Sequence, residues 1–491
     1  MRSFHGIREF VRNAFVSRPP DPIGAAGFTL LLVFVAIAPW LYGGAPENLR
    51  TNLGAGGILP LGNLVLTIFA FIIAAAAVLS KAPGVSLGGV GVPLGALAGI
   101  ALLGLVQLLP LPEAALRKLF PVNQRIYHEM SEILRIFGKT DVPRPRISIA
   151  PSETAGVVLL LLAYLALFVG AALLCHNRTK RRLLFGTLLT GAALQVFVAA
   201  FLERGTDRVR GPFANPNHFA GYLEIALALA LGALWAEVLT GSDRTEGITD
   251  PGERLEKRLR PLAGRVLLWG GLAAGIGLTK SRGAILAAAV TTLLLLTMAL
   301  LGERTRSRKR VPVRAAALAG FLLAGLLLVA AALSGRPLQR FFDFDPLQIR
   351  GNARVALWGV SLAAWREFPI AGSGLGTFRE AFRRVQPRDM RGLVEQAHNE
   401  LLQLLVTGGV LGAFLGTLAF VSLFVLLFRA WRRQKHREES AFVLAGFGAL
   451  LSLTLHGLVE FNMSIPIIPA TLACVLGGAW AAGRRNEGVH R

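Results

Sequence analysis

The feature that most constrains this chain is a series of apolar runs, each about twenty residues long, joined mostly by short basic links. An α-helix needs about 20 consecutive apolar residues to cross a bilayer. The sequence therefore predicts an all-α, polytopic integral membrane protein of about 12 transmembrane helices, with a large extracytoplasmic loop before span 10. The expected spans are 24–42, 58–80, 88–109, 154–175, 183–203, 217–239, 263–279, 283–301, 313–333, 399–428, 440–460 and 464–482.

Composition agrees with a membrane protein and excludes two other classes. Apolar residues make up 53% of the 491 residues and charged residues only 16%. A soluble protein of this length would expose far more charge, and a disordered chain would be far less apolar. The net charge of +23 is typical of nucleic-acid binding, but the basic residues gather in links between apolar runs. We therefore expect membrane lipids as partners and no nucleic acid.

The basic links also predict the orientation. Cytoplasmic loops of membrane proteins carry an excess of Lys and Arg. Basic clusters precede the first span and occupy 178–182, 304–310, 429–437 and 484–485. With twelve spans all of them fall on one side, so both termini should be cytoplasmic. The first span could alternatively be a signal peptide cleaved after Ala38, but the following Pro39 disfavours cleavage.

We divide the chain accordingly into four regions. They are a cytoplasmic N-terminus (1–23), an N-terminal transmembrane bundle (24–203), a second membrane region (204–482) and a cytoplasmic C-terminus (483–491). The two membrane regions carry the extracytoplasmic loops 110–153 and 334–398, both rich in Pro and Arg. Arginine matches two phosphate oxygens at once, although Arg exceeds Lys along the whole chain and its abundance in the loops can be compositional.

The loop 334–398 contains three candidate elements. A helix is expected from Asn352, its candidate N-cap, with Arg354 and Trp358 on one stripe; it could also lie at the membrane surface as an amphipathic helix. The glycine-rich turn 369–378 either cradles an anion with its N–H groups or only reverses the chain. At the end of the loop, His398 and Asn399 stand where a span begins. Imidazole is suited to accept a proton there, although a lone histidine is more often structural.

Three further outer segments carry polar residues. Arg282 lies in a tight turn between the seventh and eighth spans, Arg210 and Asn217 lie in the segment 210–220, and Glu460 lies in the segment 456–462. Ionisable residues at membrane depth are candidates for function. The alternatives are anchoring at the interface by long side chains and simple reversal of the chain.

Taken together, these segments resemble the O-antigen ligase and polymerase superfamily, the membrane glycosyltransferases that share the Wzy_C region. The resemblance covers about 150–480, and it marks the region 204–482 as O-antigen ligase-like. It rests on Gly-Pro-Phe-Ala-Asn-Pro-Asn-His-Phe-Ala (211–220), Ser-Arg-Gly (281–283), Arg-x-x-x-Trp with its Pro and glycine-rich turn (354–376), Ala-His-Asn-x-x-Leu-Gln (397–403) and His-x-x-x-Glu-Phe-Asn (456–462).

The resemblance implies transfer of an undecaprenyl-diphosphate-linked glycan to a sugar hydroxyl of lipid A-core or another glycan, on the periplasmic face of the bacterial inner membrane. The family's functional histidine and arginines would fall on His398, Arg354 and Arg282. His398 would be the general base and the arginines would bind the diphosphate, with inversion at the anomeric carbon and without a metal or other cofactor. As substrate-binding residues we predict Arg210, Asn217, Trp358, Asn399 and Glu460.

Two alternatives remain at this stage. A polymerase of the same superfamily uses the same core, and only a slightly closer likeness of the Asn-Pro-Asn and Ala-His-Asn segments favours the ligase. A lipid-linked oligosaccharide transporter would also be polytopic and basic. It should, however, place its arginines along a cavity inside the bundle, whereas the candidates here stand at span ends and in one loop.

Overall fold

The computed structural model describes residues 21–42, 61–80, 87–139, 143–240, 247–306, 353–390 and 392–484, and these residues are helical with connecting loops. Ten helices in them are long and apolar enough to cross a membrane, and α20 (Ile467–Gly483) is apolar but shorter. The predicted all-α polytopic membrane protein is thus confirmed. The ten are α2 (Pro22–Tyr42), α4 (Leu61–Leu79), α5 (Gly91–Leu108), α8 (Pro151–Leu174), α9 (Arg178–Leu202), α10 (Pro216–Thr240), α11 (Pro251–Leu278), α12 (Arg282–Arg306), α18 (Glu400–Arg433) and α19 (Arg437–Gly457).

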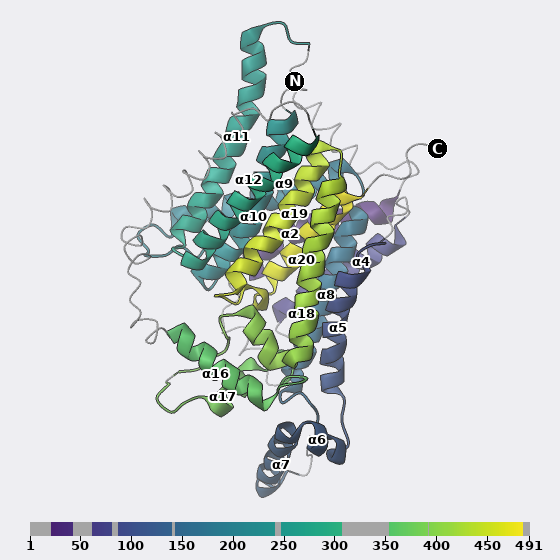
Figure 1. Ribbon diagram of the computed structural model, residues 1–491, viewed down its shortest axis with the longest axis vertical. Helices are drawn as coiled ribbons and strands as arrows, with labels where there is room; N and C mark the ends of the chain where they lie inside the picture. Colours follow the sequence, from purple (N-terminus) through teal and green to yellow (C-terminus); the bar gives the residue numbers. More distant parts are fainter. Residues whose placement is uncertain are drawn as a thin grey trace.

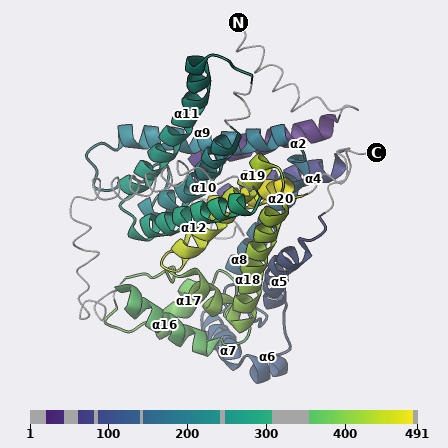
Figure 2. The same ribbon diagram turned by 45° about the horizontal axis from the view of Figure 1, so that its top comes forward.

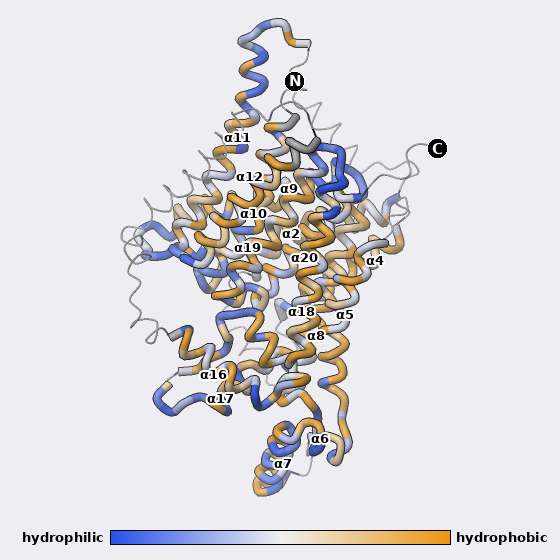
Figure 3. The backbone as a smooth tube through the Cα atoms, in the orientation of Figure 1, coloured by the Kyte–Doolittle hydropathy of each residue, from blue (hydrophilic) through white to orange (hydrophobic). Residues whose placement is uncertain are grey.

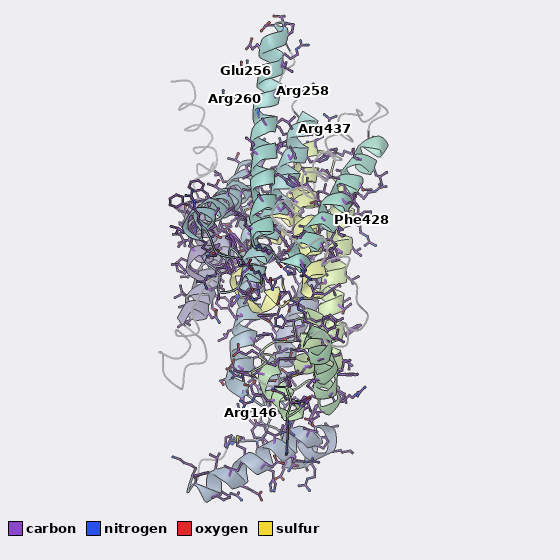
Figure 4. All side chains as sticks on the ribbon, turned by 90° about the vertical axis from the view of Figure 1, so that its left-hand side faces the viewer. Arg146, Glu256, Arg258, Arg260, Phe428 and Arg437 are labelled. Carbon is purple, nitrogen blue, oxygen red and sulfur yellow. The ribbon has the colours of Figure 1, made fainter. Side chains whose placement is uncertain are left out.

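These eleven helices correspond to eleven of the twelve expected spans. The remaining span, 313–333, and the expected helix cap Asn352 lie outside the described residues. One boundary differs clearly from expectation, because α11 begins twelve residues before the predicted 263. Asp250 caps its first turn through a hydrogen bond from the Glu253 N–H, and Pro251 stands at the first helical position, where it is tolerated. The charged half of α11, with Glu256, Arg258 and Arg260, extends beyond the bundle (Figure 4).

Helix α10 lies at the centre of the bundle, and 89% of its apolar stretch is buried. It packs along α19, and a Cβ at Gly232 would stand only 2.9 Å from the Ala441 carbonyl oxygen. Small residues let helix backbones approach this closely in membranes, where packing rather than water drives association. The close packing of α10 against α19 fixes the relative position of their ends, and both ends contribute to the site described below.

Four helices form a cap at one end of the bundle (Figures 1 and 2). They are α6 (Glu113–Leu119), α7 (Pro121–Ile136), α16 (Ala353–Glu367) and α17 (Phe378–Val385). A small apolar core that includes Phe368, Phe378 and Phe382 joins this cap to the start of α18, and Val122 of α7 packs against it. Figure 3 shows hydrophilic residues on α7 and near α17, whereas apolar residues line the spans. The predicted loops 110–153 and 334–398 therefore contribute to one structure.

The glycine-rich turn after α16 packs against a kink in α18. Gly409 has φ 63° inside α18, and a Cβ there would meet the Ile370 carbonyl oxygen at 2.2 Å. The N–H groups of Ser373 and Gly374 donate to carbonyls of α18, at 3.1 and 3.0 Å, and that of Leu375 donates to Gln107 of α5 at 2.9 Å. These three N–H groups are already satisfied, which favours the structural interpretation of the turn over an anion cradle.

The opposite end of the bundle is held by ion pairs between the start of α9 and the start of α19. Arg181 donates from Nε and Nη2 to the two carboxylate oxygens of Glu439, at 2.8 and 2.6 Å, and both side chains are buried. Arg182 pairs with Glu438 in the same way. Figure 4 places Arg437, the first residue of α19, far from Arg146, which lies near the cap. We call this region the ion-paired end.

Candidate active site

Five segments that are distant in sequence meet between the bundle and the cap. They are the starts of α10, α16 and α18, the turn before α12, and the loop 458–466 that joins α19 to α20. The antiparallel order of α10, α11 and α12, and of α18, α19 and α20, brings these helix ends to one side. We call this region the site end. It includes parts of all five motif segments found in the sequence.

The centre of the site end is a histidine–carboxylate pair. His398 Nδ1 lies 2.7 Å from Glu460 Oε1. The His398 side chain is 32% exposed, whereas that of Glu460 is only 1% exposed. A carboxylate at Nδ1 favours the tautomer in which Nδ1 carries the proton, and the lone pair then resides on Nε2. Among the described residues no hydrogen bond to Nε2 is found, so this atom is available to accept a proton.

Glu460 also binds two other groups through its second oxygen. Arg354 Nη2 lies 3.2 Å from Glu460 Oε2, and the Asn217 side-chain amide donates to the same oxygen. Burial alone would raise the pKa of Glu460, but the hydrogen bond to His398 and the charges of His398, His218 and Arg354 hold it below its usual value. Glu460 is therefore ionised at neutral pH and can stabilise a positive charge on His398.

The backbone at His398 is strained. Its φ is 48°, in the left-handed region that non-glycine residues rarely adopt. Both polar groups of the preceding Ala397 are held by side chains, its N–H by Gln403 Oε1 at 2.7 Å and its carbonyl by Trp358 Nε1 at 3.1 Å. Lys280, two residues before Arg282, is the other non-glycine residue with positive φ in the described part of the chain, at 51°. Strain of this kind costs about 1–3 kcal/mol and clusters at functional sites.

The turn before Arg282 is linked to the site end through a chain of hydrogen bonds. Arg208 donates from Nε to the Thr279 carbonyl at 2.8 Å and from Nη2 to the Asn217 side chain, which in turn donates to Glu460. The Arg282 side chain is exposed, and among the described residues it has no acidic partner. Arg354 is partly exposed, at 43%. The site end therefore presents the partly exposed Arg354 beside the histidine–carboxylate pair and the exposed Arg282 on a neighbouring turn.

The five residues predicted to bind substrate have different surroundings. Arg210 is exposed, while Asn217 and Glu460 belong to the hydrogen-bonded cluster. Trp358 holds the Ala397 carbonyl, and Asn399 caps α18 by accepting from the Leu402 N–H at 3.0 Å. These contacts give Trp358, Asn399 and Glu460 positions that orient His398, and substrate contact by any of the five stays a prediction.

Several residues of the site end were not singled out from the sequence. Arg208 is one, and it stands two positions before the predicted Arg210. Phe461 is another, because its ring lies between those of His398 and His218, with centroid distances of 4.7 and 4.5 Å. Asn462 and His456 form a further buried contact at 3.0 Å. All except Arg208 belong to the recognised motifs, but the order of residues does not reveal which of them touch.

The site end has no obvious metal centre in the part of the chain that is described. No group of three or more His, Cys, Asp or Glu side chains there is arranged to hold an ion. The ionisable groups that meet Glu460 directly are one imidazole and one guanidinium. Such a set is suited to proton transfer at His398 and to binding of an anion by the arginines.

A comparison with known families matches residues 266–416 to the Wzy_C model, described as O-antigen ligase. The matched segment contains Arg282, Arg354 and His398 and ends before Glu460. A search of curated proteins finds no match. The match confirms the resemblance to the O-antigen ligase superfamily. It lies inside the predicted region 204–482, whose boundaries stay a prediction.

Proposed function

Proceeding from its O-antigen ligase region, we propose that this multi-pass membrane protein is an inverting glycosyltransferase that works without a metal ion. It transfers a glycan from undecaprenyl diphosphate to the hydroxyl of an acceptor sugar. The observation that carries the proposal is the cluster in which one buried carboxylate, Glu460, contacts both His398 and Arg354. The cluster combines a base with a phosphate-binding group.

His398 acts as the general base in this proposal. As the acceptor oxygen forms its bond to the anomeric carbon, its proton moves to Nε2 of His398. The bond between the anomeric carbon and the diphosphate oxygen breaks, and the electron pair leaves with the diphosphate. Glu460 stabilises the resulting imidazolium through Nδ1, as a buried carboxylate does in hydrolase triads. A single displacement from the opposite face inverts the anomeric configuration.

Arg354 and Arg282 bind the departing diphosphate in this proposal. Charge that develops on the leaving group needs positive partners in place of a divalent ion, and guanidinium groups supply charge-assisted, forked hydrogen bonds. Both side chains have exposed surface, and Arg354 contacts Glu460 of the pair. A transporter of lipid-linked glycans would instead need such residues along a central cavity.

We propose that the site end faces the periplasm from the inner membrane. The support is the positive-inside rule, because the basic links at 178–182 and 429–437 lie at the ion-paired end, across the bundle from His398. Fusions of a periplasm-active reporter test this orientation. A fusion after Asp389 should be active, and fusions after Arg182 or Lys435 should be inactive. The reverse pattern would contradict the proposed reaction at this face.

Lipid A-core is the acceptor that we favour, because the matched family is described as O-antigen ligase. Deletion of the gene distinguishes this acceptor from a second lipid-linked glycan. Loss of a ligase leaves full-length glycan on the polyprenyl carrier together with unmodified lipid A-core. Loss of a polymerase leaves single repeat units, on the core or on the carrier, and this outcome would reassign the protein to the polymerase branch.

The reaction itself is tested with purified protein in detergent or nanodiscs. Lipid-linked glycan and lipid A-core are supplied without nucleotide sugars, and product glycolipid and free undecaprenyl diphosphate are measured. We expect both products in equal amounts. Two outcomes would overturn the proposal. One is translocation of the donor without bond cleavage, and the other is no transfer either to lipid A-core or to a second lipid-linked glycan.

A further inference from the structure

A second histidine–glutamate pair lies beneath the site end, inside the bundle. His456, in the last turn of α19, has Nδ1 2.7 Å from Glu224 Oε1 of α10, and both side chains are at most 1% exposed. Ser452 Oγ donates to Glu224 Oε2 at 2.9 Å. This pair has no part in the proposed reaction, because its burial keeps it from any substrate.

Keeping two ionisable groups in an apolar bundle needs an explanation. Taking charges out of water costs several kcal/mol per ion, and apolar residues of the same size often stabilise a fold at least as well. Buried polar pairs are best known for fixing one arrangement of neighbouring segments among several. The contacts of His456 identify which segments it would fix.

The first segment is the loop that carries Glu460. Asn462 contacts one histidine with each end of its side-chain amide, His456 Nδ1 at 3.0 Å and His218 Nδ1 at 3.2 Å. The His218 ring also packs edge-on against Phe461, the neighbour of Glu460. The loop is thus attached to α10 and α19 through Asn462, two residues from the carboxylate that orients His398.

The second segment is the first turn of α12, which carries Arg282. Gly283 packs directly on the His456 ring, because a Cβ at this glycine would lie 2.9 Å from His456 Cδ2. The same Cβ would lie 2.9 Å from Cγ2 of Val459, the residue before Glu460. Gly283, the neighbour of Arg282, therefore packs against both the His456 ring and the side chain next to Glu460.

We propose that His456, held by Glu224, is a positioning residue that sets the distance between the arginine clamp and the histidine–carboxylate pair. It fixes the start of α12 and the loop 458–466 at once, and it does not touch the substrate. The inference rests on the proposed function, because it assigns Arg282 and Glu460 to one reaction.

The test compares turnover per folded molecule in purified variants. For His456→Gln we expect kcat to fall about 10- to 100-fold, the range typical when an outer partner of a functional group is removed, with the donor KM changed only a few-fold. All reacting groups remain in this variant, but the distance between Arg282 and the histidine–carboxylate pair is no longer fixed. Glu439→Gln at the ion-paired end is the control, since it weakens another buried ion pair and should lower the melting temperature without changing kcat.

Gly283→Ala keeps the inference testable if His456→Gln does not fold. Alanine favours helix over glycine, so α12 should remain stable, while the added methyl group pushes on both His456 and Val459. We expect a several-fold lower kcat with only a modest fall in melting temperature, because the gain in helix preference offsets part of the cost of overpacking. Wild-type kcat in Gly283→Ala, or in folded His456→Gln, would overturn the positioning role.

A His398→Ala sample separates this inference from the proposed function. If His398→Ala keeps its turnover, the proposed mechanism itself is wrong. If His398→Ala is inactive while the His456 and Gly283 variants turn over normally, the mechanism stands and only the positioning role is wrong.

Discussion

Both ends of the bundle place an arginine beside a glutamate, but the two arginines differ in how much of the side chain is exposed. At the ion-paired end Arg181 is 7% exposed, and its Nε and Nη2 each donate to an oxygen of Glu439. At the site end the single carboxylate of Glu460 contacts His398 and Arg354 together, and Arg354 keeps 43% of its side chain exposed. The buried Arg181–Glu439 pair joins two helices, whereas a partly exposed guanidinium such as that of Arg354 is suited to bind an anion.

The two ends also differ in backbone geometry. At the ion-paired end, Asn177 caps α9 in the ordinary extended conformation and accepts from the Lys180 N–H at 2.8 Å. At the site end, both His398 and Lys280 adopt the left-handed region. Strain is retained at the end that carries the proposed chemistry, and relaxed geometry at the end that only connects helices.

Replacing His398 should have the largest effect, because it removes the proposed base from the site end. We expect His398→Ala to lose transfer by roughly 10²–10⁴-fold, the contribution typical of a general base, with the melting temperature nearly unchanged because the ring is partly exposed. His398→Asn is the matched variant, since asparagine accepts the left-handed backbone more readily and still provides no imidazole. Turnover is measured with lipid-linked donor, and near-normal rates in either variant would remove His398 from the mechanism.

Exchange of the site-end arginines for lysine should have the next largest effect. Arg354→Lys and Arg282→Lys keep the charge but lose the fork. Each should cost roughly 2–4 kcal/mol of transition-state stabilisation, which corresponds to about 30- to 1000-fold in kcat/KM. Arg366→Lys, at the far end of α16, is the control and should keep wild-type turnover. If both site-end variants also keep most of their activity, a diphosphate clamp is excluded.

Most of this difference between the ends was predictable from the sequence. Apolar runs gave the spans, basic links gave the side of each end, and the motif segments gave His398, Arg354 and Arg282. The partner of each arginine was not predictable. Arg181 stands in a basic link and Arg354 in a helix of the outer loop, and their carboxylates lie 258 and 106 residues away. Only the packing of α9 against α19, or of α16 over the loop 458–466, determines which arginine is neutralised.

The glycine-rich turn 369–378 is a second case in which the sequence does not predict the partners of a segment. Its composition allowed an anion cradle or a chain reversal equally well. Which one holds depends on whether other atoms already occupy its N–H groups, and the acceptors come from α18 and from Gln107 of α5. Gln107 is 268 residues from Leu375. No local pattern could identify so distant a partner.

At the ion-paired end, a substitution should change stability and leave turnover alone. Glu439→Gln removes the charge opposite buried Arg181 but keeps one amide oxygen as acceptor. We expect a loss of about 1–3 kcal/mol of folding free energy, the usual worth of a hydrogen bond to a charged group, seen as a lower melting temperature in detergent. Activity per folded molecule should match wild type. A large fall in kcat would mean that the two ends are coupled through the bundle.

The smallest expected effect is that of chelation. If Arg354 and Arg282 neutralise the leaving diphosphate, the reaction needs no divalent ion, and excess EDTA should leave turnover within error of the untreated enzyme. The comparison between the ends sharpens the test. Arg354 at the site end is 43% exposed beside its contact with Glu460, whereas Arg181 at the ion-paired end is 7% exposed and bound to Glu439. Loss of activity in EDTA with recovery on Mg²⁺ or Mn²⁺ would indicate that a metal ion assists the leaving group. In that case Arg354 and Arg282 would have to bind another part of the substrate. The lysine variants combined with EDTA separate these possibilities, because under the arginine clamp added Mg²⁺ should not restore Arg354→Lys.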